Sequence, residues 1–153
     1  MKTSKWYEKT IRRHYPKLNI IHLNALQSAP GAEEQNCLHL DYNILTQEKE
    51  VSSQPISAII AIEQFRLDIV TDPSNKKLKT ITVEPGDMIV FPNKCIHRGG
   101  PNKTNKNQRR IFLYIASDEA DIDNDSVTLC GWNATNKCYE VGHDDKRKRQ
   151  RKL

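Results

Sequence analysis

Two residues of types that commonly bind metals, His39 and Asp41, are separated by one residue in the stretch from Cys37 to Tyr42. On an extended strand, residues i and i+2 point to the same face. An imidazole and a carboxylate placed in this way can hold one cation, and they leave room for a third ligand from a distant strand. The pair alone is weak evidence, because an H-x-D sequence arises by chance in many proteins.

A distant histidine, His97, can supply the third ligand, since it too lies in a β-rich part of the chain. Two histidines and one carboxylate on one side of a metal ion are typical of non-haem Fe(II) sites, and they leave the opposite positions open for substrate and O2. At neutral pH the imidazoles can be neutral and the carboxylate ionised, as such a site requires. The sequence therefore predicts a metal site made of His39, Asp41 and His97.

Two adjacent arginines, Arg109 and Arg110, stand at the start of the apolar run from Ile111 to Ile115. A guanidinium there could bind a carboxylate through two parallel hydrogen bonds, as a keto-acid cosubstrate would require. Neighbouring residues of a strand face opposite sides, so only one of the two arginines can enter a pocket.

Longer motifs around these residues resemble Fe(II)/2-oxoglutarate-dependent oxygenases, in particular the phytanoyl-CoA dioxygenase-like branch. The motifs are P-G-A-E-E-Q at 30–35, L-H-L-D at 38–41, E-P-G-D-M-I-V-F at 84–91 and H-R-G-G-P-N-K-T at 97–104, followed by the two arginines. The similarity runs from about Asn19 to Ser117. It implies a double-stranded β-helix core, which is a jelly roll or cupin-like fold.

The resemblance also implies an activity. His39, Asp41 and His97 would bind Fe(II), and Arg109 or Arg110 would bind the distal carboxylate of 2-oxoglutarate. Such a dioxygenase consumes O2 and 2-oxoglutarate, releases succinate and CO2, and hydroxylates or oxidatively demethylates its substrate. The substrate itself stays unidentified at this point.

The choice between the two arginines depends on the length of one loop. Counted from His97 without gaps, the family's arginine falls near Gln108, and one additional residue in the loop would place Arg109 there. Arg109 is therefore preferred, and Arg110 is the alternative.

Short, regularly spaced apolar segments predict a mainly β fold without help from the resemblance. The segment from Phe65 to Val70 alternates clearly between apolar and polar residues. No helix long enough for a crossover between parallel strands intervenes, so the sheets should be largely antiparallel, as in a sandwich or jelly roll. The expected strands cover 20–24, 38–42, 57–62, 65–70, 78–84, 88–91, 95–97, 110–116 and 127–132. A short amphipathic helix is expected over 4–15, with an apolar stripe of Trp6, Tyr7, Ile11 and Tyr15.

The length of 153 residues suits one domain, which we place at 1–143 with its core at about 19–117. The net charge of +5 comes mainly from residues 144–153, which hold six basic and two acidic side chains. This tail should be disordered by self-repulsion. Its basic part, from Lys146 to Lys152, could be a nuclear address, a tether to nucleic acid or to an acidic surface, or only a solubilising end.

Neither a membrane-spanning stretch nor a signal peptide is visible, so we expect an intracellular protein, cytoplasmic or nuclear, whose four cysteines are reduced. The alternative to an enzyme is a non-catalytic jelly-roll binding module, associated with nucleic acid through the basic tail. Succinate release would separate the two.

Overall fold

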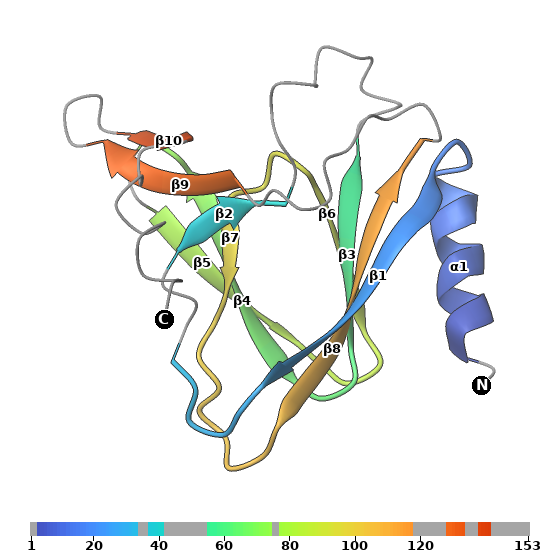
Figure 1. Cartoon of the computed structure of the whole chain (residues 1–153), viewed down its shortest axis with the longest axis horizontal. Helices are drawn as coiled ribbons and strands as arrows, with labels where there is room; N and C mark the ends of the chain where they lie inside the picture. Colours follow the sequence, from blue (N-terminus) through green and yellow to red (C-terminus); the bar gives the residue numbers. More distant parts are fainter. Residues whose placement is uncertain are drawn as a thin grey trace, which may run out of the picture.

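Two antiparallel sheets and one helix make up the part of the chain that the computed structural model describes, which is residues 3–33, 37–41, 55–74, 77–117, 128–133 and 138–141 (Figure 1). The helix α1 spans Thr3–His14. The strands are β1 Asn19–Ser28, β2 Leu38–Leu40, β3 Ile56–Ala61, β4 Phe65–Asp72, β5 Lys77–Val83, β6 Met88–Pro92, β7 His97–Gly99, β8 Gln108–Ala116, β9 Thr128–Asn133 and β10 Cys138–Val141.

The strand order confirms the predicted double-stranded β-helix. One sheet has the order β1-β8-β3-β6 and the other the order β10-β9-β2-β7-β4-β5. Every strand pair in the described ranges is antiparallel. The fold is therefore mainly β, with a jelly-roll, cupin-like architecture and a short N-terminal helix.

Several predicted strand limits need correction. β1 is longer than expected, and the expected strand at 95–97 instead begins at His97 and ends at Gly99. The reason is a turn, because the backbone N–H of Cys95 donates to the carbonyl of Pro92 at 2.9 Å. β10 was not predicted at all.

The main core lies between the sheets, where the predicted alternation of β4 is confirmed. Phe65 and Leu67 are buried in a cluster with Phe91 and Phe112 from the facing sheet. Asp68 points the other way and is buried, and it forms an ion pair with the half-buried Arg98, so this ion pair covers part of the opposite face of β4. The apolar side of β4 thus forms one wall of the barrel interior.

The helix α1 covers the outer side of the four-stranded sheet. Tyr7 and Ile11 are buried in a cluster with residues of β3 and β8, and the Tyr7 hydroxyl donates to the carbonyl of Gly86 at 2.8 Å. Two members of the expected apolar stripe, Trp6 and Tyr15, are instead exposed. A helix resting on a sheet buries only the residues that point directly at it, so the stripe is narrower than the sequence suggested.

No helix in the described part of the chain is long and apolar enough to cross a bilayer. The acidic stretch 118–125 and the basic tail 144–153 lie outside the described residues. The predictions for the tail are therefore not addressed by the fold.

Candidate metal site

The candidate ligands His39, Asp41 and His97 come together inside the barrel. His39 lies on β2 and is the direct cross-strand partner of His97 on β7. Asp41 follows the last residue of β2 and lies on the same side as His39, as the i, i+2 spacing predicts. One potential ligand atom from each residue lies within 4.8 Å of the other two.

Hydrogen bonds to the backbone orient both imidazoles. Nδ1 of His97 lies 2.9 Å from the carbonyl of Cys95, and Nδ1 of His39 lies 3.3 Å from the carbonyl of Cys37. A carbonyl only accepts, so each Nδ1 carries the proton and each Nε2 of a neutral ring keeps its lone pair. The backbone therefore sets the tautomer in which both Nε2 atoms can bind a metal.

Both lone pairs point toward the carboxylate of Asp41. Its Oδ1 lies 3.5 Å from Nε2 of His97 and 3.7 Å from Nε2 of His39. Three electron-rich atoms this close repel one another unless a proton or a cation lies between them. The donor set of two imidazole nitrogens and one carboxylate oxygen is the one that non-haem Fe(II) sites use, so the residues fit that metal.

Burial changes the protonation of all three groups. It lowers the pKa of His97 to about 4 and also lowers the pKa of His39, whose shift the neighbouring His97 increases. Burial raises the pKa of Asp41 to about 6, against the opposing effects of Ser57 and His39. The histidines are therefore neutral at neutral pH, and their contacts with Asp41 are not ordinary ion pairs.

A residue that the sequence analysis missed, Ser57, holds the carboxylate in place. Its hydroxyl donates to Oδ2 of Asp41 at 2.6 Å, and both side chains are buried. This leaves Oδ1 as the oxygen that faces the two imidazoles. A serine in the otherwise apolar strand β3 was the available signal, but the sequence did not indicate which side it faces.

Replacing Ser57 with alanine should weaken metal binding about tenfold. The loss of a partner that orients a ligating carboxylate typically costs about 10–100-fold in affinity. Titration calorimetry with Mn(II) measures this. A matched control is Ser74→Ala, which removes a hydroxyl that donates to Asp72 on the surface and should leave affinity unchanged. Equal effects of the two changes would contradict the role of Ser57.

A pocket of about 170 Å³ adjoins the three candidate ligands. Beside them it is lined by Asn24, Leu26, Ile59, Leu67, Gly99, Arg110, Phe112 and Tyr114. The polar residues Asn24 and Tyr114 were not predicted as site residues. Tyr114 could have been found, because it lies on the same strand face as Arg110 and Phe112 at spacings of two.

The two arginines lie on opposite sides of β8, and of the two only Arg110, the alternative to the preferred Arg109, lines the pocket. Arg109 is exposed and binds Glu63 through its backbone N–H at 2.7 Å and its Nε at 3.0 Å. The same pair raises the pKa of Arg109 and lowers that of Glu63. Arg109 therefore points away from the pocket.

Arg110 points into the pocket. Its Nη1 donates to the hydroxyl of Ser28 at 3.0 Å, and its guanidinium carbon lies 5.5 Å from the centre of the Phe65 ring. Among the described residues it has no acidic partner, and burial lowers its pKa. A partly buried cation without a counter-ion is a ready site for a carboxylate.

The loop that leads to β8 is held by Asn102. Its buried side-chain amide donates to the carbonyls of Ser28, Ala29 and Lys106, at distances of 2.8–3.1 Å. These bonds join the end of β1 to the loop before β8. They thereby fix the register that directs Arg110 inward.

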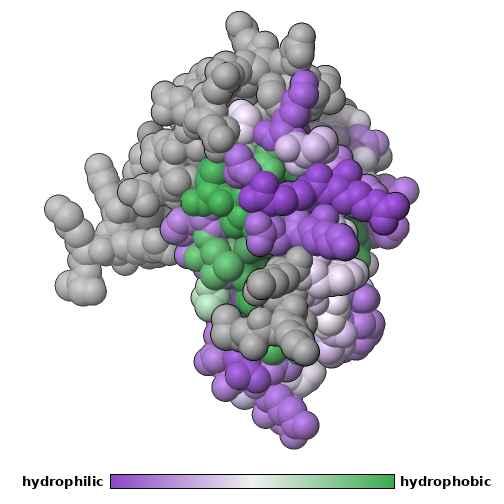
Figure 2. All heavy atoms as spheres, turned by 90° about the vertical axis from the view of Figure 1, so that its right-hand side faces the viewer, coloured by the Kyte–Doolittle hydropathy of each residue, from purple (hydrophilic) through white to green (hydrophobic). Residues whose placement is uncertain are grey.

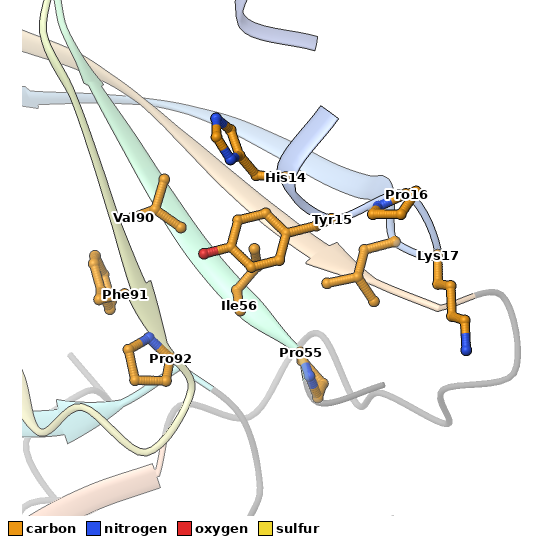
Figure 3. A pocket seen from close by; sticks show the side chains of 10 residues that line it. His14, Tyr15, Pro16, Lys17, Pro55, Ile56, Val90, Phe91 and Pro92 are labelled. Carbon is orange, nitrogen blue, oxygen red and sulfur yellow. The ribbon is translucent and has the colours of Figure 1, made fainter. Parts of the chain in front are cut away.

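A larger hollow of about 450 Å³ lies outside the barrel, between the end of α1 and the strands β3 and β6 (Figure 3). Figure 3 shows the Tyr15 ring on the same side of the hollow as Ile56, with Val90 beside it. The walls of this hollow are mainly apolar, and none of the three candidate metal ligands lines it. The three candidate metal ligands and Arg110 therefore belong to the smaller pocket.

Comparisons with known proteins agree with this fold. The family model described as phytanoyl-CoA dioxygenase (PhyH) matches residues 45–111, which confirms the resemblance. The matched range contains His97 and both arginines, but it begins after His39 and Asp41. No curated protein matches the sequence.

Solved structures share the fold at low sequence identity. AviO1 from Streptomyces viridochromogenes Tue57 is 15% identical, with a TM-score of 0.59 over 74% of this chain and 58% of that one. The non-heme monooxygenase ThoJ is 11% identical, with a TM-score of 0.59 over 80% of this chain and 56% of that one. EvdMO1 is 15% identical, with a TM-score of 0.53 over 66% of this chain and 28% of that one. This chain therefore spans less than two thirds of each of these relatives.

Proposed function

We propose that this protein is an Fe(II)- and 2-oxoglutarate-dependent dioxygenase that hydroxylates, or oxidatively demethylates, its substrate. The observation that carries the proposal is the position of Arg110, whose guanidinium lines the same pocket as His39, Asp41 and His97. A small pocket with a cation site and a fixed positive charge suits a short dicarboxylate. The family match and the oxygenase fold support the same activity.

The three ligands would hold Fe(II) through Nε2 of the two histidines and Oδ1 of Asp41. Bound there, the iron would supply the oxidative chemistry by which 2-oxoglutarate, O2 and a C–H bond become succinate, CO2 and an alcohol. One O2 oxygen enters succinate and the other enters the substrate, so atoms and electrons balance without a further reductant.

The remaining pocket residues would bind the cosubstrate and exclude water. Arg110 would meet the distal carboxylate through two parallel hydrogen bonds, which offset the cost of desolvating that charge. Apolar side chains from both sheets, Ile59, Leu67 and Phe112, line the pocket and would keep bulk water away from a bound metal. Burial raises the pKa of Tyr114 to about 12, so its phenol stays neutral and can donate a hydrogen bond.

Turnover of 2-oxoglutarate tests the proposal without knowledge of the substrate. The protein, supplied with Fe(II), 2-oxoglutarate and air, should form succinate and CO2 in equal amounts while O2 is consumed. Asp41→Ala should form none, and Asp87→Ala, which changes an exposed turn residue, should match the unaltered protein. Metal and 2-oxoglutarate binding without succinate formation, also in the presence of candidate substrates, would favour the non-catalytic binding module.

A further inference from the structure

One edge of β1 pairs with no other strand in the described part of the chain. The strand ends the four-stranded sheet, and among the described strands it pairs only with β8. It is ten residues long and contains neither a charged residue nor a proline, the two residue types that usually protect an exposed strand edge. Such an edge is a template for pairing with another strand.

The same strand carries exposed apolar side chains. Leu23 is 59% exposed, and Ile20 and Ile21 are exposed by more than a third. Figure 2 shows the face of the molecule that carries the helix, where hydrophobic and hydrophilic residues lie side by side at the surface. Contiguous exposed apolar residues of this kind mark interaction surfaces in soluble proteins.

The polarity pattern of β1 is symmetric about Leu23. Residues at equal distances from Leu23 are alike in polarity, and the pairs are His22 with Asn24, Ile21 with Ala25, Ile20 with Leu26, and Asn19 with Gln27. In an antiparallel pair of identical strands centred on Leu23, the members of each pair lie opposite each other. His22 and Asn24 share the inner face, but beyond the bulge Ile20 pairs with Ile115 of the outer cluster, whereas Leu26 lines the pocket. The match of polarity and face therefore holds for the residues next to Leu23, and this central part of β1 fits pairing with itself.

We propose that β1 pairs antiparallel with β1 of a second copy of this chain, with the two-fold axis at Leu23. Such an interface is isologous, because each copy contributes the same surface. Leu23 would then contact the partner's Leu23 on the outer face, which removes the most exposed apolar residue of the strand from water. Two four-stranded sheets would join into one continuous sheet.

The charges near β1 are compatible with this pairing. Arg12 of α1 shares a hollow with Asn19 and Ile20 at the start of β1 and is paired with Glu8, and Arg110 of β8 points inward, where it donates to Ser28. Antiparallel pairing places the starts of the two strands at opposite ends of the interface. The two basic helices are therefore kept apart, and no like charges meet at the axis.

A β-bulge limits the extent of regular pairing. The register between β1 and β8 shifts between Ile20 and His22. The regular part of β1 thus begins at His22, and the strongest pairing is expected over the three central residues, His22 to Asn24. The apolar residues on either side of these three would add contacts with the second copy.

The second copy would also contribute to the pocket. Asn24 lines the pocket beside the metal ligands, and its Oδ1 lies 3.0 Å from Nε2 of His22, whose ring packs against Tyr114. In the proposed pairing, His22 lies opposite the partner's Asn24 on the inner face. The pocket wall formed by β1 would therefore continue into the second copy.

Sedimentation velocity of the full chain over a wide concentration range tests the pairing. We expect a concentration-dependent dimer. Leu23→Lys should raise the dimer dissociation constant by about a hundredfold or more, because it removes two apolar contacts and sets two like charges opposite each other. The matched control is Ile62→Lys, which alters a 45% exposed residue outside β1 and should leave the dimer unchanged.

Cross-linking gives a second, independent measurement. Opposite residues of an antiparallel pair have Cβ atoms about 5 Å apart. A short bismaleimide should therefore join two copies of Leu23→Cys but not two copies of Leu78→Cys, a control on β5, above the background of the native cysteines. A monomer at every concentration, or a dimer that Leu23→Lys leaves intact, would overturn the proposal and assign the edge to a different partner. Neither measurement needs metal or 2-oxoglutarate, so its outcome is independent of the proposed activity.

Discussion

Asp41→Ala should abolish measurable binding of Mn(II), used as a stand-in for Fe(II). The change removes the only negative charge of the candidate site and leaves two neutral imidazoles. The loss should exceed the roughly 10–100-fold that removal of an outer partner costs. Titration calorimetry measures the affinity directly. The metal-induced rise in melting temperature, which reports binding to the folded state, should vanish as well.

Two controls separate charge from folding. Asp41→Asn keeps the shape of the side chain and can still accept a hydrogen bond from Ser57, yet it lacks the charge, so it should also bind poorly. In the presence of a chelator, the melting temperature of both variants should stay close to that of the unaltered protein, since Asp41 is a buried carboxylate whose ionisation is costly. An unchanged Mn(II) affinity in Asp41→Ala would show that the cation binds elsewhere.

Arg110→Ala should raise the dissociation constant of 2-oxoglutarate by about a hundredfold. Removal of one member of a buried charge pair typically costs about 3–5 kcal/mol, and Arg110 is only partly buried, so the lower end of that range applies. Calorimetric titration of 2-oxoglutarate into the Mn(II)-loaded protein measures the effect. Arg110→Lys should also weaken binding, because lysine keeps the charge but loses the two parallel hydrogen bonds.

The neighbouring arginine provides a matched control. Arg109→Ala removes the same charge one residue away, but its guanidinium is exposed and bound to Glu63, so the 2-oxoglutarate affinity should change by no more than a few-fold. A larger effect at Arg109 than at Arg110 would contradict the assignment. No effect at either arginine would remove the support for 2-oxoglutarate and leave the metal site unaffected.

The sequence alone determined that the side chains of His39 and Asp41 lie on the same face of one strand. A strand alternates its side chains with a period of two whatever the rest of the fold does, so the H-x-D spacing was sufficient to place both on one face. The turn and strand pattern was likewise sufficient for the jelly roll. These properties are local, or repeat along the chain, and they do not depend on which strands become neighbours.

The approach of His97 was decided by the tertiary structure. Nothing in its sequence distance from His39 states that the two residues become direct cross-strand partners on β2 and β7. Each Nδ1 contacts the carbonyl two residues earlier in the chain, which is a local feature. What strand pairing decided is that the two free Nε2 atoms come close to each other and to Asp41.

Side-chain direction on β3 and β8 was also decided only by the tertiary structure. All six residues of β3 are buried, and β8 buries apolar residues on both faces, because α1 covers one side of the sheet and the barrel interior covers the other. Where both faces are apolar, the alternation that would reveal the inner face disappears. For this reason the sequence showed that only one of the two arginines can face inward. The packing of α1 against the outer face determined that it is Arg110 and that Ser57 reaches Asp41.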